Sequence, residues 1–140
     1  MLIRKSAHLN IDLNKKTRTD LGSWSPAWGN YGKTAFHMAC QYEYSEIVEL
    51  LIKKSVELNI NINEKDQDGR TAFHLVCDNK YHWNPATVNV ILDNSELFGL
   101  DLTLKDKNGD TGFQIAERHE KTAIINLIKR KMPSIAEVID

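Results

Sequence analysis

The sequence predicts an all-α solenoid, in which helix–turn–helix units joined by hairpin-like turns stack on one another. Two observations support this fold class. A turn glycine followed by threonine and then phenylalanine occurs three times, beginning at Gly32, Gly69 and Gly109. An apolar segment follows each copy, at 47–52, 87–92 and 124–128. Because neither helix of such a unit can bury its apolar side alone, the units are expected to stack.

Each unit is predicted to contain a glycine turn, a short helix, a second turn and a longer helix. The threonines at 34, 71 and 111 are suitable N-caps, because a threonine hydroxyl can accept a hydrogen bond from a free N–H of the first turn. The phenylalanines are 37 and 40 residues apart, from 73 − 36 and 113 − 73. The predicted units are 31–67, 68–107 with a loop insertion, and 108–140, which closes the stack.

A partial fourth copy stands at the front of the chain. The segment 2–6 (Leu-Ile-Arg-Lys-Ser) matches 51–55 (Leu-Ile-Lys-Lys-Ser), so the chain is expected to begin inside the second helix of a repeat. From that serine to the next turn glycine the distance is 26 residues (32 − 6) at the front but 14 (69 − 55) in the next unit. Residues 1–30 are therefore predicted to be a truncated front cap with a twelve-residue insertion, which carries Trp24 and Trp28.

Composition narrows the classes of protein that fit this chain. Its 140 residues are 41% hydrophobic and 26% charged, which is typical of a globular protein. A formal net charge of −1 gives no electrostatic reason to expect nucleic acid or an anionic membrane as partner. Two cysteines are too few for a disulfide scaffold, and the first five residues lack the apolar core of a signal peptide. We expect a cytoplasmic, reduced protein that is a monomer when free and has no cofactor.

The repeated motif resembles the ankyrin repeat. The residues that carry the resemblance are Gly-x-Thr-Ala-Phe-His-x-Ala-Cys at 32–40, followed by Ile-Val-Glu-x-Leu-Ile at 47–52. Ala and Phe replace the family's Pro and Leu, Gln114 replaces its His, and the usual Asn-Gly-His after the first helix is missing. The resemblance implies a single ankyrin-repeat domain over 1–140, not an enzyme, that binds a protein partner. It also implies that the motif histidine ties turn backbone and that the cysteine packs between helices.

The aromatic residues give the candidate binding site. The family presents a surface made of turn tips and the exposed side and end of the first helix, and all tryptophans and tyrosines of this chain fall on such connecting segments. Tyrosine and tryptophan are among the residues that dominate protein-binding hot spots. The predicted anchors are Trp24, Trp28, Tyr31, Tyr42, Tyr44, Tyr81 and Trp83, and the predicted polar rim is Lys33, Arg70 and His82.

Other interpretations stay open at this point. Trp24 and Trp28 could pair within their own loop or cover the truncated front of the stack. The repeats could be only a scaffold fragment of a longer regulatory protein, and the departures from the family pattern fit either a natural or an engineered binder. His37 with Cys40 and His74 with Cys77 have ligand types that suit zinc or a small molecule. The resemblance favours structural roles for these four side chains. At the end of the chain, 132–138 is expected to form an extra turn or short helix after the Pro133 break.

Overall fold

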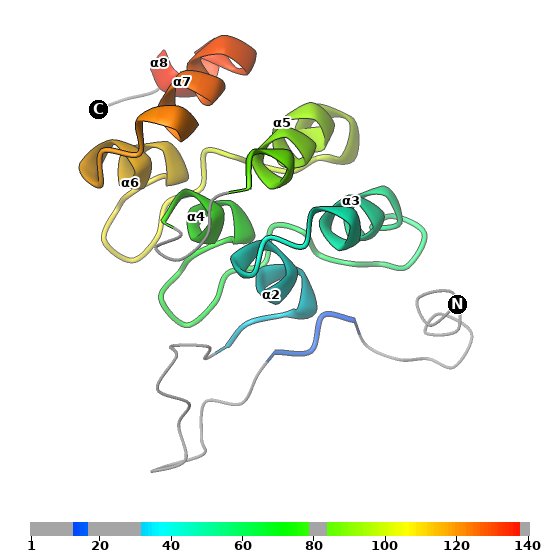
Figure 1. Cartoon of the computed structure of the whole chain (residues 1–140). Helices are drawn as coiled ribbons and strands as arrows, with labels where there is room; N and C mark the ends of the chain where they lie inside the picture. Colours follow the sequence, from blue (N-terminus) through cyan, green and yellow to red (C-terminus); the bar gives the residue numbers. More distant parts are fainter. Residues whose placement is uncertain (1–12, 17–31, 79–83, 138–140) are drawn as a thin grey trace.

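The computed structural model describes residues 13–16, 32–78 and 84–137, and this part of the chain forms helices and turns without any strand (Figure 1). The all-α prediction is thereby confirmed. A short helix alternates with a longer one along the three repeats. The helices are α2 (Ala35–Gln41), α3 (Ser45–Lys53), α4 (Ala72–Cys77), α5 (Pro85–Phe98), α6 (Gly112–Arg118), α7 (Thr122–Lys131) and α8 (Pro133–Glu137).

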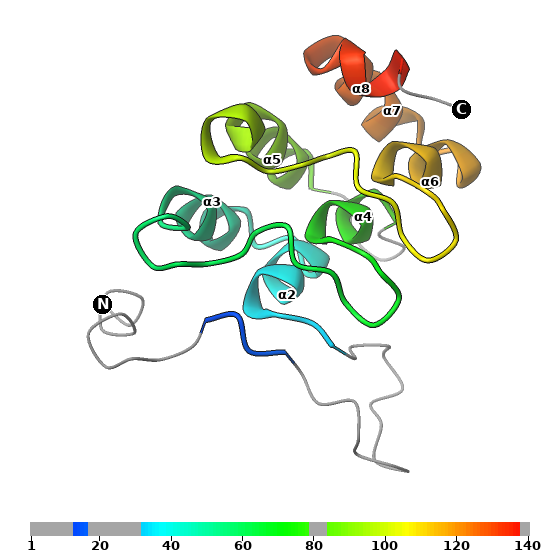
Figure 2. The same cartoon turned by 180° about the vertical axis from the view of Figure 1, so that it is seen from behind.

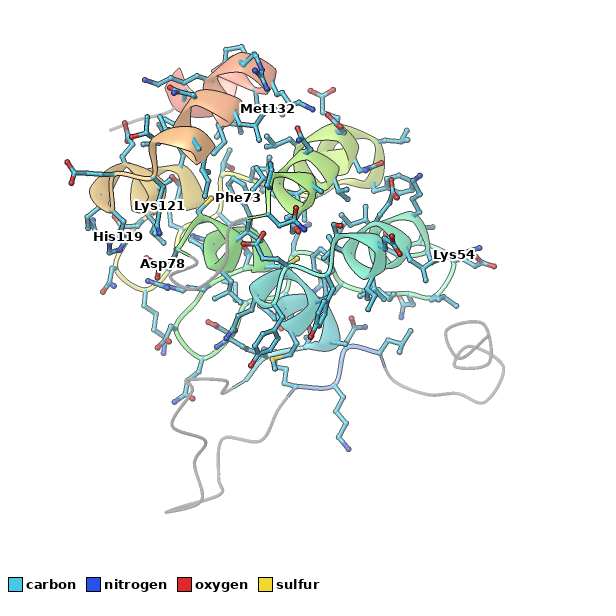
Figure 3. All side chains as sticks on the ribbon, viewed as in Figure 1. Lys54, Phe73, Asp78, His119, Lys121 and Met132 are labelled. Atoms are coloured by element: carbon cyan, nitrogen blue, oxygen red, sulfur yellow. The ribbon has the colours of Figure 1, made fainter. Side chains whose placement is uncertain are left out.

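The helices lie in two rows, which Figures 1 and 2 show from opposite sides. The short helices α2, α4 and α6 pack side by side in one row, and the longer helices α3, α5 and α7 pack in the other. The apolar core fills the space between the rows and includes Phe36, Phe73 and Phe113, all at most 3% exposed. Phe73 lies near the middle of the stack in Figure 3. Stacking is what buries the apolar side of each helix.

The predicted threonine caps are confirmed, and the motif histidine joins one repeat to the next. Thr34 caps α2, and the ring Nδ1 of His37 accepts the backbone N–H of Thr34 at 3.0 Å. With Nδ1 accepting, Nε2 carries the proton and donates to the carbonyl of Arg70 in the next repeat at 3.0 Å. His74 bonds the carbonyl of Asp110 in the same way at 2.8 Å. In the closing repeat glutamine replaces the histidine and makes only the hydrogen bond within its own repeat. Gln114 Oε1 accepts from the N–H of Thr111 at 2.9 Å.

The turns between repeats are hairpin-like, and aspartates within them accept hydrogen bonds from nearby backbone N–H groups. The backbone N–H of Asp66 donates to the carbonyl of Arg70 at 2.8 Å. The carboxylate Oδ1 of Asp66 accepts from the N–H groups of Asp68 and Arg70, each at 2.9 Å. Asp106 repeats this arrangement one unit later. The turns also touch one another, since the N–H of Lys107 donates to the carbonyl of Asp68 at 3.1 Å.

Residues 13–16 stand in the register predicted for the front copy, 49 residues before their counterparts (51 − 2 = 49). Asn14 donates to the carbonyl of Asn59 at 2.8 Å and accepts from the N–H of Asn61 at 2.6 Å. Its counterpart 49 residues later, Asn63, makes the equivalent bonds to Gly99 and Asp101 at 2.9 and 2.7 Å. This stretch of the front copy therefore sits against the first full repeat as 62–65 sits against the second.

The closing end is also as predicted. α7 ends in the cations Lys129, Arg130 and Lys131, which favour the negative end of the helix dipole. Pro133 then begins the short helix α8, which packs against α7. Ile135 and Ala136 of α8 are partly buried against the core.

Candidate protein-interaction surface

Two tyrosines form an exposed aromatic pair at the turn between α2 and α3. The turn is held by the N–H of Tyr42, which bonds Met38 at 3.0 Å, and by the N–H of Tyr44, which bonds Ala39 at 3.0 Å. Tyr42 is 43% and Tyr44 56% exposed, and their ring centroids lie 6.2 Å apart at an interplanar angle of 32°. Tilted rings at this separation attract one another, so the pair presents one aromatic surface. We call Tyr42 and Tyr44 the tyrosine pair.

Glu43, between the two tyrosines, anchors their turn to the next repeat. Its backbone is left-handed, with φ of 58°, where the family motif has glycine, and its side chain is only 7% exposed. Glu43 Oε1 accepts the backbone N–H of Asn84 at 3.2 Å, and the Asn84 amide reaches the carbonyl of Glu43 at 3.4 Å. Because Asn84 is the N-cap of α5, the pair is fixed to the start of that helix.

A shallow hollow of ≈ 300 Å³ opens beside Tyr44. It is lined by five consecutive residues, Glu43, Tyr44, Ser45, Glu46 and Ile47. Ile47 is 47% exposed, so the hollow combines an aromatic ring, an aliphatic side chain and carboxylates. This volume is at the lower limit of small-molecule sites. The hollow suits a side chain of a partner better than a cofactor.

The predicted polar rim is only partly where the sequence placed it. Lys33 is 4% exposed, and its Nζ lies 3.5 Å from the buried carboxylate of Asp66, so its expected position at an exposed rim is wrong. The lysine side chain folds against the next hairpin turn instead of pointing outward. Arg70 keeps a 24% exposed side chain and pairs with Asp78 at 2.8 Å and with Asp106 at 3.6 Å.

The ends of α4 and α6 carry paired charges, where α2 carries the tyrosine pair. Asp78, just after α4, accepts from Arg70 and lies 3.2 Å from Nε2 of His119, just after α6. Figure 3 shows Asp78 and His119 at neighbouring helix ends. The sequence alone did not predict Asp78 as part of this surface. The sequence does contain a pattern that could have indicated this pair. Arg70 and Asp78 are eight residues apart, and the oppositely ordered pair Asp110 and Arg118 has the same separation one repeat later.

Six of the predicted site residues lie outside the described residues. They are Trp24, Trp28, Tyr31, Tyr81, His82 and Trp83. The structure therefore brings together Tyr42 and Tyr44, and places Arg70 one repeat further on. Lys33 and Arg70 precede their helices, whereas the tyrosine pair follows α2. A seven-residue helix rises about 10 Å, so the turn glycines and the tyrosine pair lie at opposite ends of the short helices.

The His-x-x-Cys pairs serve the structure. Both ring nitrogens of His37 and of His74 are within bonding distance of backbone groups, at 2.8–3.0 Å. Cys40 and Cys77 are free thiols with no exposed surface, and burial raises the pKa of each thiol. A protonated, buried thiol is a poor metal ligand. Among the described residues, no group of three or more His, Cys, Asp or Glu side chains is placed to hold a metal ion.

Comparison with known proteins gives the family. Residues 2–106 match the family model of ankyrin repeats in three copies. The chain belongs to the ankyrin repeat family. The match begins within the predicted front copy, and the closing repeat extends the same helix pair beyond it. The ankyrin repeat domain of Bcl-3 has the same fold, with a TM-score of 0.71 over 94% of this chain and 49% of that one, at 21% identity.

Similar curated proteins are much longer than this chain. Mouse Rabankyrin-5 is 24% identical over 109 residues, which cover 78% of this chain and 8% of that protein. Mouse protein phosphatase 1 regulatory subunit 12A is 32% identical over 87 residues, covering 61% of this chain and 7% of that protein. Ankyrin repeats are a protein–protein interaction module and a scaffold family rather than a catalytic one. None of the helices among the described residues could span a membrane.

Proposed function

We propose that this chain is a non-catalytic module that binds a protein partner, with the tyrosine pair as its central anchor. One observation carries the proposal: two large rings are about half exposed, held in contact with each other, and set beside a hollow that admits a partner side chain. Tyrosine gives rigid contact area at a low cost in conformational entropy. An anchor seated in a small pocket is typical of a binding hot spot.

The rigidity of the turn supports this role. The backbone bonds of Tyr42 and Tyr44 and the bonds between Glu43 and Asn84 fix the pair before any partner arrives. Affinity rises when binding groups are already held in their bound geometry. The exposure is therefore built into a stable part of the molecule.

The remaining candidates extend the proposed surface. Tyr81, His82 and Trp83 immediately precede Asn84 in the sequence, and Asn84 is bonded to Glu43, so we include these three residues in the proposed surface. Arg70 supplies a partly exposed cation on the neighbouring repeat. Trp24 and Trp28 of the front insertion, with Tyr31 beside the first turn glycine, are proposed as a second group of contacts.

The partner is expected to present an apolar side chain flanked by a basic group. The apolar side chain would enter the hollow between Tyr44 and Ile47, and the basic group would meet Glu46, which is exposed at its edge. An exposed pair of this kind acts mainly on specificity and on the rate of association.

Capture with the 140-residue chain as bait, followed by mass spectrometry, identifies the partner and tests the proposal. Tyr42→Ala with Tyr44→Ala should lower partner affinity at least about 30-fold, since two hot-spot residues each contribute about 1–2 kcal/mol or more. The matched control is Val56→Ala with Leu97→Ala, which removes apolar groups that are 81% and 79% exposed elsewhere. That control should bind as the wild type does.

Circular dichroism separates a binding role from a structural one. Both double variants should keep the helical signal and melting temperature of the wild type. If the tyrosine variant melts much lower, or if it binds the captured partner normally, the pair is not the anchor. Trp24→Ala with Trp83→Ala then tests the outlying candidates in the same assay.

A further inference from the structure

The three turn glycines differ in what covers them. Gly32, Gly69 and Gly109 all have left-handed backbone, with φ of 66°, 75° and 82°. A Cβ built on Gly32 would lie 3.0 Å from the backbone nitrogen of Gln67, and one built on Gly69 would lie 2.9 Å from that of Lys107. Around Gly109 the same construction meets no atom of the described chain within 4 Å, its sequence neighbours aside. The following turn therefore covers the first two glycines, whereas the tip of the closing turn is open.

The open turn carries the one Asn-Gly sequence of the chain, at Asn108 and Gly109. Both residues are exposed. In such a sequence the backbone nitrogen of the glycine can attack the side-chain carbonyl of the asparagine, because glycine has no side chain to hinder the approach and its backbone is permissive. The equivalent turn of the preceding repeat has Asp68 before a half-buried Gly69. Sequence and exposure thus coincide at the closing turn.

The two turns have the same internal hydrogen bond and differ in their outer one. In each, the glycine N–H donates to the carbonyl of the aspartate three residues earlier, Asp66 or Asp106, at 3.0 Å. The attacking nitrogen must lose this bond, so the reaction requires local opening of the turn. The preceding turn is also held from outside, since the N–H of Lys107 donates to the carbonyl of Asp68 at 3.1 Å. Within the described chain, no corresponding bond reaches the carbonyl of Asn108.

We propose that Asn108 is a site of spontaneous deamidation and isoaspartate formation. The Gly109 nitrogen gives its proton to solvent and bonds to Cγ of Asn108. The bond from Cγ to the side-chain amide nitrogen breaks, ammonia leaves, and a cyclic imide is formed. Water then adds to either imide carbonyl and opens the ring, which gives aspartate or isoaspartate. A carboxylate replaces a neutral amide, so the formal net charge changes from −1 to −2 (−1 − 1). The proposal does not depend on the protein-binding function.

Isoaspartate would loosen the closing turn, because it adds one backbone carbon at position 108. Asp106 and Asp110 are bonded across this position. The N–H of Asp106 donates to the carbonyl of Asp110 at 2.9 Å, and the N–H of Asp110 donates to Oδ1 of Asp106 at 2.9 Å. The same carbonyl of Asp110 accepts from Nε2 of His74 in the preceding repeat at 2.8 Å. Hydrogen exchange at the amide of Asp110 should therefore be faster in the isoaspartate form.

Asp68→Asn is the matched variant, because it places the same Asn-Gly sequence in the covered turn. The folded whole chain is incubated in mildly alkaline buffer and digested with trypsin, whose cleavage sites put the two turns in separate peptides, 66–70 and 108–118. Mass spectrometry measures the replacement of amide by carboxylate in each, and chromatography separates aspartate from isoaspartate. Conversion at position 108 should be at least about tenfold faster than at position 68, since the covered turn opens less often. In urea the two rates should be similar.

Three outcomes would overturn the proposal. The first is similar rates at positions 68 and 108 in the folded chain. The second is an intact Asn108 in the folded chain after a time in which the urea-unfolded chain is converted. The third comes from Asn108→Gln, which should form no more acidic species on isoelectric focusing. An acidic species that still appears in this variant at the wild-type rate would mean that another residue is the site.

Discussion

The two ends of the described stack differ in the side chains that they leave exposed and in the contacts that satisfy their charges. At the closing end, the position of Lys33 and Arg70 is taken by Asp110, which pairs with Arg118 of its own repeat at 2.7 Å. The short helix α8 lies against α7. At the front, Ile47 and Leu50 stay about half exposed. At the closing end the charged side chains pair within their own repeat, whereas the first described repeat leaves apolar side chains exposed.

The position of a residue within its repeat does not by itself decide its environment. Lys33 and Arg70 pair with an aspartate of the next hairpin turn, at 3.5 and 3.6 Å. No further hairpin turn follows Asp110 in the described chain, and this position carries a negative charge where Lys33 and Arg70 carry a positive one. A solenoid repeat is complete only with its neighbours, so an end repeat requires a different sequence.

The largest expected effect compares Ile52 with its counterpart at the closing end, Lys129 (52 + 77). Ile52 is fully buried on α3, a helix that packs against α5, whereas Lys129 is exposed. Ile52→Lys should cost about 4 kcal/mol or more, because it places an unpaired charge in the core. Lys129→Ile should change stability by less than about 0.5 kcal/mol. Urea unfolding followed by circular dichroism measures both.

A small loss for Ile52→Lys, or a large gain for Lys129→Ile, would contradict the comparison between the ends. The first result would mean that the stack tolerates a charge between α3 and α5. The second would mean that the closing end also lacks a neighbour.

Much of this fold follows from the sequence, since the repeated spacing of glycine, threonine and phenylalanine marks the start of each short helix. The register of the front copy was readable as well, and Asn14 confirms it. The direction of the Lys33 side chain could not be predicted from the sequence. The neighbouring Gly32 indicates a turn, but nothing near it in the sequence indicates that the carboxylate of Asp66, in the next hairpin turn, lies beside the lysine. The left-handed Glu43 was equally hidden, since its role depends on a bond to Asn84, 41 residues away. Tertiary contacts decide such features.

The second effect is a loss of stability in mild acid, centred on the first two repeats. Burial lowers the pKa of His37 and His74, and the bonds to the carbonyls of Arg70 and Asp110 offset only part of this. Unfolded histidine takes up a proton near pH 6.5. As the pH falls below about 6.5, the unfolded state binds more protons than the folded state, so stability declines. The melting temperature should therefore be lower at pH 5.5 than at pH 7.5.

His74→Gln is the matched variant, because Gln114 already shows that glutamine can serve at this position in the closing repeat. It should lower stability at pH 7.5, since the bond to Asp110 is lost, and it should reduce the dependence on pH. An equal melting temperature at both pH values, or an unchanged pH dependence in the variant, would show that these rings do not titrate on unfolding.

The smallest expected effect concerns the charge pair that finishes the stack. The Arg118 side chain is 58% exposed, so water screens its attraction to Asp110. Arg118→Gln should shift the melting temperature by less than about 2 °C. Arg70→Gln should cost more, about 1–3 kcal/mol, because it leaves the buried carboxylate of Asp106 without its cation. Equal losses in the two variants would mean that Arg118 joins repeats as Arg70 does, and that the closing end is not self-contained.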